Sequence, residues 1–144
     1  MTKQDSQTPM ITFETRGSVR LGTIELTRML DISNVSRFGS EALRYLEAHP
    51  GSHLMLNFAQ VKYLTSAALT ELLRINDAAK AGGGSVRLCG LSPEIQKVFR
   101  ITNLDKLFVL HPDDDVAGAL ARYERSLQVA ADETAWKNAA KERE

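Results

Sequence analysis

The sequence predicts an α/β fold built on a mostly parallel central sheet, with an antiparallel hairpin at its N-terminal end. Short apolar runs with strand periodicity alternate with helical apolar stripes through most of the 144 residues. The composition, 43% hydrophobic and 25% charged, is typical of one globular domain. We therefore expect one domain at residues 11–127, a flexible N-terminal tail at 1–10, and a helical extension or flexible tail at 128–144.

The charge balance and the cysteine count exclude several classes of function for this chain. Lys and Arg number 18 and so do Asp and Glu, so the net charge of zero argues against direct binding of nucleic acid or an anionic membrane. No apolar run approaches a membrane span, and the first nine residues are polar rather than signal-like. The single cysteine, Cys89, permits no internal disulfide. We expect a cytoplasmic protein.

The N-terminal hairpin and the first helix follow from periodicity. Ile11 and Phe13 alternate with polar residues and Gly17 marks a turn, which predicts two antiparallel strands. The apolar face shifts at Gly22, where a bulge would account for the shift. From Ser33 the spacing becomes helical, and Pro50-Gly51 ends this first helix. Its apolar positions are Val35, Phe38, Ala42 and Leu46.

Apolar residues on both sides of the strand Leu54–Phe58 predict a central strand that is covered on both faces. A broad apolar stripe then predicts a second helix, which runs to about Ala81 and ends in Gly82-Gly83-Gly84.

The remaining elements complete about four helices. A strand at Val86–Cys89 precedes Ser92-Pro93-Glu94, which has the cap, proline and acid of a helix start. A short last strand is expected at Leu107–Leu110, and Asp113-Asp114-Asp115 opens the last helix. Its apolar stripe comprises Val116, Leu120, Tyr123 and Leu127.

Several groups that resemble sites have simpler structural explanations. The three histidines are not at ligand spacing, and the acidic run at 113–115 is best explained as a helix cap, so no metal is expected. The glycines at 82–84 follow a helix and precede a strand, the reverse of a phosphate-binding loop. Cys89 lies in an apolar strand without a flanking histidine, so it is expected to be a buried hydrophobe. No cofactor and no enzymatic activity are predicted.

Two hydroxyl groups meet at the start of the second helix. Thr65 and Ser66 both suit the N-cap position, and from the residues alone either side chain serves as the cap. Ser66 is predicted to be solvent-accessible at the N-terminal end of this helix.

An ordered series of motifs between residues 54 and 108 points to a known family. The series comprises Leu54-Met55-Leu56-Asn57-Phe58, Val61, Tyr63-Leu64-Thr65-Ser66-Ala67-Ala68-Leu69, Ala81-Gly82-Gly83-Gly84, Leu88, Gly90-Leu91-Ser92-Pro93-Glu94-Ile95, Val98-Phe99, Ile101-Thr102 and Leu104-Asp105-Lys106-Leu107-Phe108. It resembles the STAS domain of anti-sigma factor antagonists. The resemblance spans residues 11–125 and is weakest in the N-terminal hairpin. It implies a single STAS-type domain.

The resemblance also implies a switch. Family members carry Asp-Ser-Ser-Gly before the second helix, and a partner anti-sigma factor with serine kinase activity phosphorylates the first serine. That serine corresponds to Ser66. Phosphorylation generally releases the anti-sigma factor, and a phosphatase resets the switch. Thr65, Ala67 and Ala68 replace the other three family residues, and Thr65 is an alternative acceptor. The implied partner-binding residues are Thr65, Ser66, Ala67 and Ala68.

Two further alternatives stay open at this point. The domain could instead be a scaffold or sensor subunit of a signalling assembly, with Ser66 acting only as a cap. After Gln128 the chain offers chiefly alanine, charged residues and Trp136, too little apolar area to hold a long extension against the core. The contrasting interpretation is that Trp136 anchors a partner or a second copy in a weak homo-oligomer.

Overall fold

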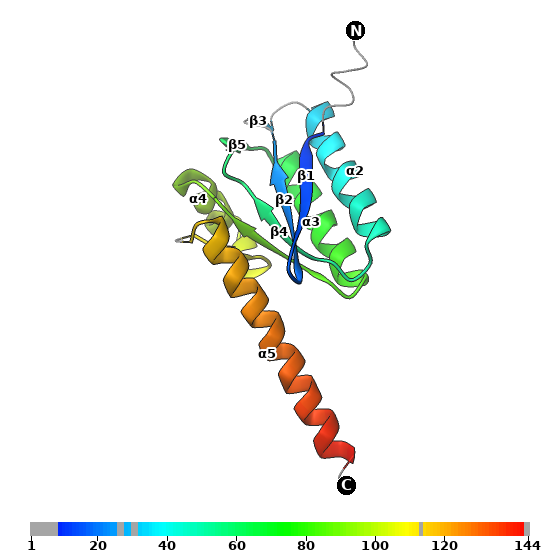
Figure 1. The fold of residues 1–144 in the computed structure, drawn as a ribbon. Coiled ribbons are helices and arrows are strands. Elements are labelled where there is room, and N and C mark those ends of the chain that lie inside the picture. The colour runs from blue at the N-terminus through cyan, green and yellow to red at the C-terminus, as the bar shows by residue number, and fades with distance from the viewer. Residues whose placement is uncertain (1–8, 26–27, 30–31, 113, 143–144) are drawn as a thin grey trace.

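The central feature of the fold is a five-stranded sheet in the order β1-β2-β4-β6-β7 (Figure 1). A computed structural model describes residues 9–25, 28–29, 32–112 and 114–142. The strands are β1 (Ile11–Arg16), β2 (Val19–Ile24), β4 (His53–Asn57), β6 (Ser85–Cys89) and β7 (Val109–His111). β1 and β2 are antiparallel, and every other neighbouring pair is parallel. The predicted fold class is confirmed.

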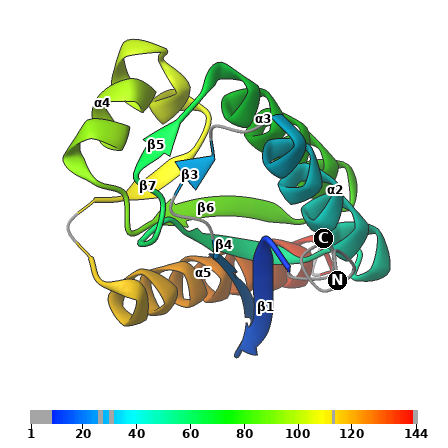
Figure 2. The same cartoon turned by 90° about the horizontal axis from the view of Figure 1, so that it is seen from above.

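Helices cover both faces of this sheet (Figure 2). The helices are α2 (Ile32–Ala48), α3 (Ser66–Ala81), α4 (Pro93–Ile101) and α5 (Val116–Glu142), with a 3-10 turn, η1, at Leu104–Lys106. α2 and α3 pack side by side on one face, whereas α5 crosses the opposite face. The four predicted helices are therefore present.

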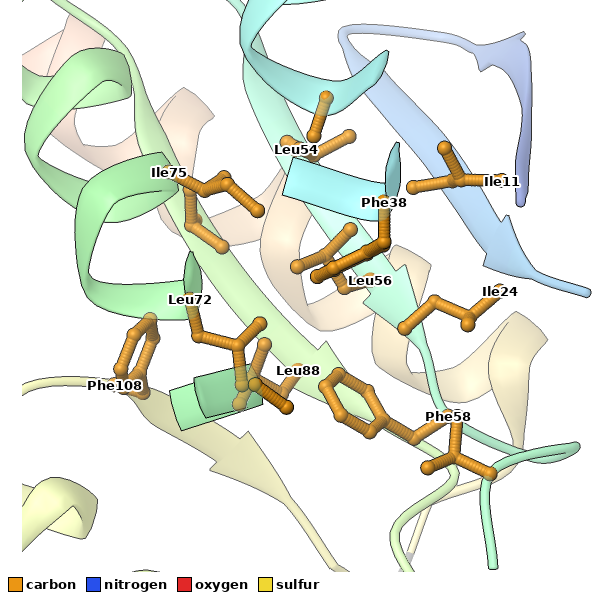
Figure 3. Packing of buried hydrophobic residues seen from close by; sticks show 14 of the residues in the cluster. Ile11, Ile24, Phe38, Leu54, Leu56, Phe58, Leu72, Ile75, Leu88 and Phe108 are labelled. Carbon is orange, nitrogen blue, oxygen red and sulfur yellow. The ribbon is translucent and has the colours of Figure 1, made fainter. Parts of the chain in front are cut away.

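β4 lies at the centre of the sheet and is buried on both faces, as predicted. Leu54 and Leu56 point into the larger core, where they pack with Phe38 and Leu72 (Figure 3). Met55 points to the other face and belongs to a smaller core under α5. Both faces of β4 therefore depend on helices that come from distant parts of the chain.

The bulge expected at Gly22 is absent. The shift of the apolar face that suggested it arises because the two ends of β2 are buried on opposite faces of the sheet. The pairing of β1 with β2 is uninterrupted from Ile11 opposite Ile24 to Arg16 opposite Val19. Within it, Gly22 lies opposite Phe13. The apolar face shifts along β2 because Val19 belongs to the core under α5, whereas Ile24 belongs to the core under α2 and α3.

Three local features differ from the prediction. A second, two-stranded parallel sheet pairs β3 (Arg28–Met29) with β5 (Tyr63–Leu64), and neither strand was predicted. The last strand begins at Val109 rather than Leu107, because the N–H groups of Leu107 and Phe108 both donate to the Leu104 carbonyl and close the turn after η1. Of the predicted N-terminal tail, residues 1–8 lie outside the described residues. Met10 is buried, and its N–H donates to Glu41 Oε1 at 2.9 Å.

The turn between α3 and β6 is tightly fitted against the start of β4. Gly82 caps α3, and the Gly84 N–H donates to the Ala79 carbonyl at 2.8 Å, so the glycines form the predicted helix end. The Ser85 N–H donates to the Ser52 carbonyl at 3.2 Å. A β-carbon at Gly84 would lie 1.9 Å from that same carbonyl oxygen. The close approach of two backbones therefore requires glycine at position 84.

Gly84→Ala is expected to lower the free energy of unfolding by about 1–3 kcal/mol, because the clash is with backbone that has to shift. Gly82→Ala is the matched control: its β-carbon would meet only ordinary contacts of 3.5 Å or more, at a φ of −85°. Denaturant unfolding of both variants measures the difference. Equal stabilities would show that the Ser52 carbonyl does not constrain this turn.

Candidate functional site

Thr65 caps the N-terminus of α3. Its backbone is extended, with φ −96° and ψ 165°, and its Oγ1 accepts a hydrogen bond from the Ala68 N–H at 3.2 Å. Its carbonyl accepts the first intrahelical bond, from the Leu69 N–H at 3.1 Å. Of the two hydroxyl groups that suited the cap, the fold uses the one on Thr65.

Ser66 is the first residue of α3 and its side chain is exposed, which confirms the predicted position. Its carbonyl accepts from the Thr70 hydroxyl at 3.1 Å. Within the described part of the chain, no hydrogen bond involves the Ser66 hydroxyl. The hydroxyl is thus available to solvent and to a partner, and the helix start does not need it.

The residues around Ser66 form an exposed surface, which we call the α3 entry surface and define by Lys62, Tyr63, Ser66 and Ala67. Tyr63 is 55% exposed on β5, immediately before the helix. Ala68 does not belong to this surface. Its side chain is fully buried because it faces the larger core, so of the four implied contact residues it offers nothing to a partner.

The electrostatics of the helix start favour an anion beside Ser66. The first N–H groups of a helix have no intrahelical acceptor, and the helix dipole adds partial positive charge there. No acidic residue lies in the first turn of α3, whereas α4 carries Glu94 in its first turn. A phosphate on Ser66 would therefore meet no carboxylate from the first turn of its own helix.

The three histidines lie apart from one another, and each has a different neighbour within hydrogen-bond distance. His49 Nδ1 lies 3.0 Å from the Tyr45 carbonyl, and His53 Nδ1 lies 2.9 Å from Ser85 Oγ. His111 Nδ1 lies 3.3 Å from Asp114 Oδ2. Among residues 9–25, 28–29, 32–112 and 114–142, no three His, Cys, Asp or Glu side chains gather where they could hold a metal ion.

The acidic run before α5 caps that helix. Asp115 precedes Val116, and its carboxylate accepts from the Gly118 N–H at 2.7 Å. Asp114 instead binds the Arg122 guanidinium at 3.0 Å. Asp113 lies outside the described residues. The capping interpretation is thus confirmed for Asp115.

The chain matches a known family of domains over most of its length. The family model described as "STAS domain" matches residues 11–119. The chain belongs to the STAS domain family. The match begins at β1 and extends into α5, so it covers the whole sheet and the Ser66 site.

Several solved structures share the fold at low sequence identity. An anti-sigma factor antagonist from Mycobacterium paratuberculosis is 19% identical with a TM-score of 0.66, over 79% of this chain and 92% of that one. The phosphorylated form of the Bacillus cell fate determinant SpoIIAA is 17% identical with a TM-score of 0.58, over 78% and 97%. The murine anion transporter Slc26a9 is 11% identical with a TM-score of 0.62, over 78% of this chain and 18% of the transporter.

In the described part of this STAS domain, no helix combines the length and the apolar character that a membrane span requires.

Sequence reasoning about this STAS domain missed the exposure of Lys62 and Tyr63. No element was predicted at these two residues, because the two-residue strand β5 is too short to show alternation. The only available signal was a charged residue beside an aromatic one, which is also common at the margin of a core.

Thr65→Ala is expected to lower the free energy of unfolding by about 1 kcal/mol, because the variant loses the side-chain bond to the Ala68 N–H. Ser66→Ala is the matched control and should leave stability within about 0.5 kcal/mol of the wild type. Thermal or denaturant unfolding distinguishes the two. A larger loss at Ser66 would mean that its hydroxyl supports the fold.

Burial raises the pKa of the Cys89 thiol to about 11, and it raises the pKa of Tyr123 in the same small core. Both groups stay protonated in the folded state and ionise more readily once unfolded. The free energy of unfolding is therefore expected to fall as the pH rises from about 9 towards 11.

Iodoacetamide at pH 8 should leave Cys89 unmodified in the folded protein and alkylate it in denaturant, as mass spectrometry would measure. Rapid alkylation of the folded protein would contradict the burial of Cys89 under α5.

Proposed function

We propose that this STAS domain is an anti-sigma factor antagonist, which binds a kinase-type anti-sigma factor through the α3 entry surface and is switched by phosphorylation of Ser66. One observation carries the proposal: Ser66 is exposed at the first position of α3 while the neighbouring Thr65 performs the capping. The domain itself has a regulatory binding role, and the kinase and phosphatase activities belong to its partners.

The separation of the two hydroxyl groups suits a switch. Thr65 Oγ1 is half-buried and already accepts from the Ala68 N–H, so a kinase would have to disturb the helix start to reach it. Ser66 requires no such disturbance. We therefore propose Ser66 as the acceptor, with Thr65 as the alternative acceptor.

The phosphate would change binding without changing the fold. A phosphoserine adds about −1.5 to −2 charges at pH 7, and the helix N-terminus favours negative charge. A partner surface that fits the neutral site would then have to accommodate this charge and its hydration. A loss of a few kcal/mol of binding free energy corresponds to a hundredfold or more in affinity.

A second candidate function is a STAS scaffold or sensor subunit without a phosphorylation switch. Threonine and alanine at positions 65 and 67, in place of the aspartate and serine that the family resemblance implies, favour this alternative. The structural likeness to part of a transporter agrees with STAS folds serving inside larger assemblies.

Ser66→Asp is expected to weaken binding to the cognate kinase-type anti-sigma factor by about tenfold or more while leaving the melting temperature nearly unchanged. Ser66→Ala should bind like the wild type and resist phosphorylation by that kinase in the presence of Mg-ATP. Calorimetric titration measures affinity, and intact-mass spectrometry measures phosphorylation.

Thr70→Asp is the matched control, since it places the same charge on exposed helix surface one turn further along. If Ser66→Asp and Ser66→Ala bind equally well, Ser66 is not part of the mechanism. Phosphate found on Thr65 in protein purified from its own cells would move the switch by one residue.

A further inference from the structure

α5 extends far beyond the sheet that it covers (Figure 1). Its 27 residues correspond to a helix about 40 Å long. The first half packs Ala119, Leu120 and Tyr123 against the sheet. Every side chain from 128 to 139 is exposed, and Trp136 is 70% exposed. A bare helical arm with its aromatic side chain in solvent is typical of a binding element.

A groove runs beside this arm, between α5 and β7. α5 packs against β2 and β6, and on the outer strand β7 the side chain of Val109 is 49% exposed. Register pairs Val109 with Arg87, which places both on the face that α5 crosses. The groove has a volume of about 590 Å³, and its lining includes Arg87, Val109, Pro112, Arg122, Arg125 and Val129.

The α5 residues that face the groove continue as one stripe along the arm. Arg122, Val129 and Trp136 are spaced seven residues apart, so they lie on the same side of the helix. The charged residues on and beside this stripe change sign along the helix. Arg122 and Arg125 lie before Val129, and the acidic pair Asp132-Glu133 follows it.

We propose that this stripe pairs antiparallel with the same stripe of a second copy, as a two-fold symmetric dimer centred near Val129. An antiparallel partner brings its acidic half to this copy's basic half. Arg125, four residues before Val129, then meets Asp132 of the second copy, three residues after it. Arg122 keeps its ion pair with Asp114 of its own chain. Two-fold symmetry makes the Arg125–Asp132 contact twice.

The same arrangement accounts for the groove. Trp136 of each copy lies seven residues beyond the centre, so it reaches the level of Arg122 on the other copy. There the groove offers apolar side chains from Val109 and Pro112 and guanidinium groups that stack well on an indole ring. This pairing buries the largest exposed side chain of the arm in the groove beside it.

The charge order favours a second copy over a helix from another protein. Self-pairing requires one helix to carry both members of an ion pair at nearly equal distances from a centre, as Arg125 and Asp132 do at four residues before and three residues after Val129. A surface built for a different acidic helix would need the arginines but not Asp132, Glu133 and Trp136 on the same stripe.

Sedimentation velocity of the full chain tests the proposal, with a reversible monomer to dimer equilibrium expected as concentration rises. Trp136 is the only tryptophan, so its fluorescence emission should shift to shorter wavelength over the same concentration range. Trp136→Ala should weaken the association by about tenfold or more.

Charge reversal tests the antiparallel geometry. Arg125→Asp and Asp132→Arg are each expected to weaken self-association by about tenfold or more, because each puts like charges opposite one another twice. An equimolar mixture of the two variants should form a heterodimer, since both pairs are then opposite in charge. The double variant should regain the homodimer. Thr134→Arg, on the opposite side of the arm, is the matched control and should associate like the wild type.

A chain that stays monomeric at every concentration would overturn the proposal, and so would a dimer that is unaffected by the reversals. A mixture that fails to associate although the wild type does would overturn the antiparallel pairing. If a helix from another protein bound the stripe while the chain alone stayed monomeric, the second copy would be the wrong occupant. The Ser66 variants should dimerise normally, so the dimer and the proposed switch are tested independently.

Discussion

The burial of β4 on both faces is the constraint on which the rest of the fold depends. A central parallel strand cannot leave either face in water when it reads Leu54, Met55, Leu56, so helices must cover both sides. α2 and α3 cover one side and α5 the other. The two cores are unequal: the larger contains most of the buried aromatic residues, whereas the smaller is closed mainly by the first half of α5.

That division separates the two proposed binding surfaces. The α3 entry surface lies at the end of a helix of the larger core, whereas the stripe of Arg122, Val129 and Trp136 lies on α5, the helix that closes the smaller core. The sheet stands between the two helices, and each surface is built on an element whose buried residues hold it in place. An event at one surface therefore does not require the other to rearrange.

The sequence predicted most of the fold because long elements carry clear periodicity. The stripe of α2, from Val35 to Leu46, is fully buried as expected, and Ser92 caps α4 as its motif indicated. The short strands β3 and β5 were missed because two residues cannot show alternation. The apparent irregularity at Gly22 had a tertiary cause, since the two ends of β2 face different cores.

The position of Ser66 was predictable, but the choice of Thr65 as the cap was not, because both side chains suit that position. The groove beside α5 depends on how the helix crosses the sheet, and sequence patterns carry no such information.

The capping bond of Thr65 has a consequence for how this site can change over evolutionary time. Folding constrains position 65 and leaves position 66 free, because only the first of the two oxygens supports the helix start. Selection for stability therefore acts on the threonine, whereas a serine retained at position 66 would have to be maintained by what binds or modifies it. Variation at position 66 among related chains would then trace the gain and loss of signalling rather than of folding.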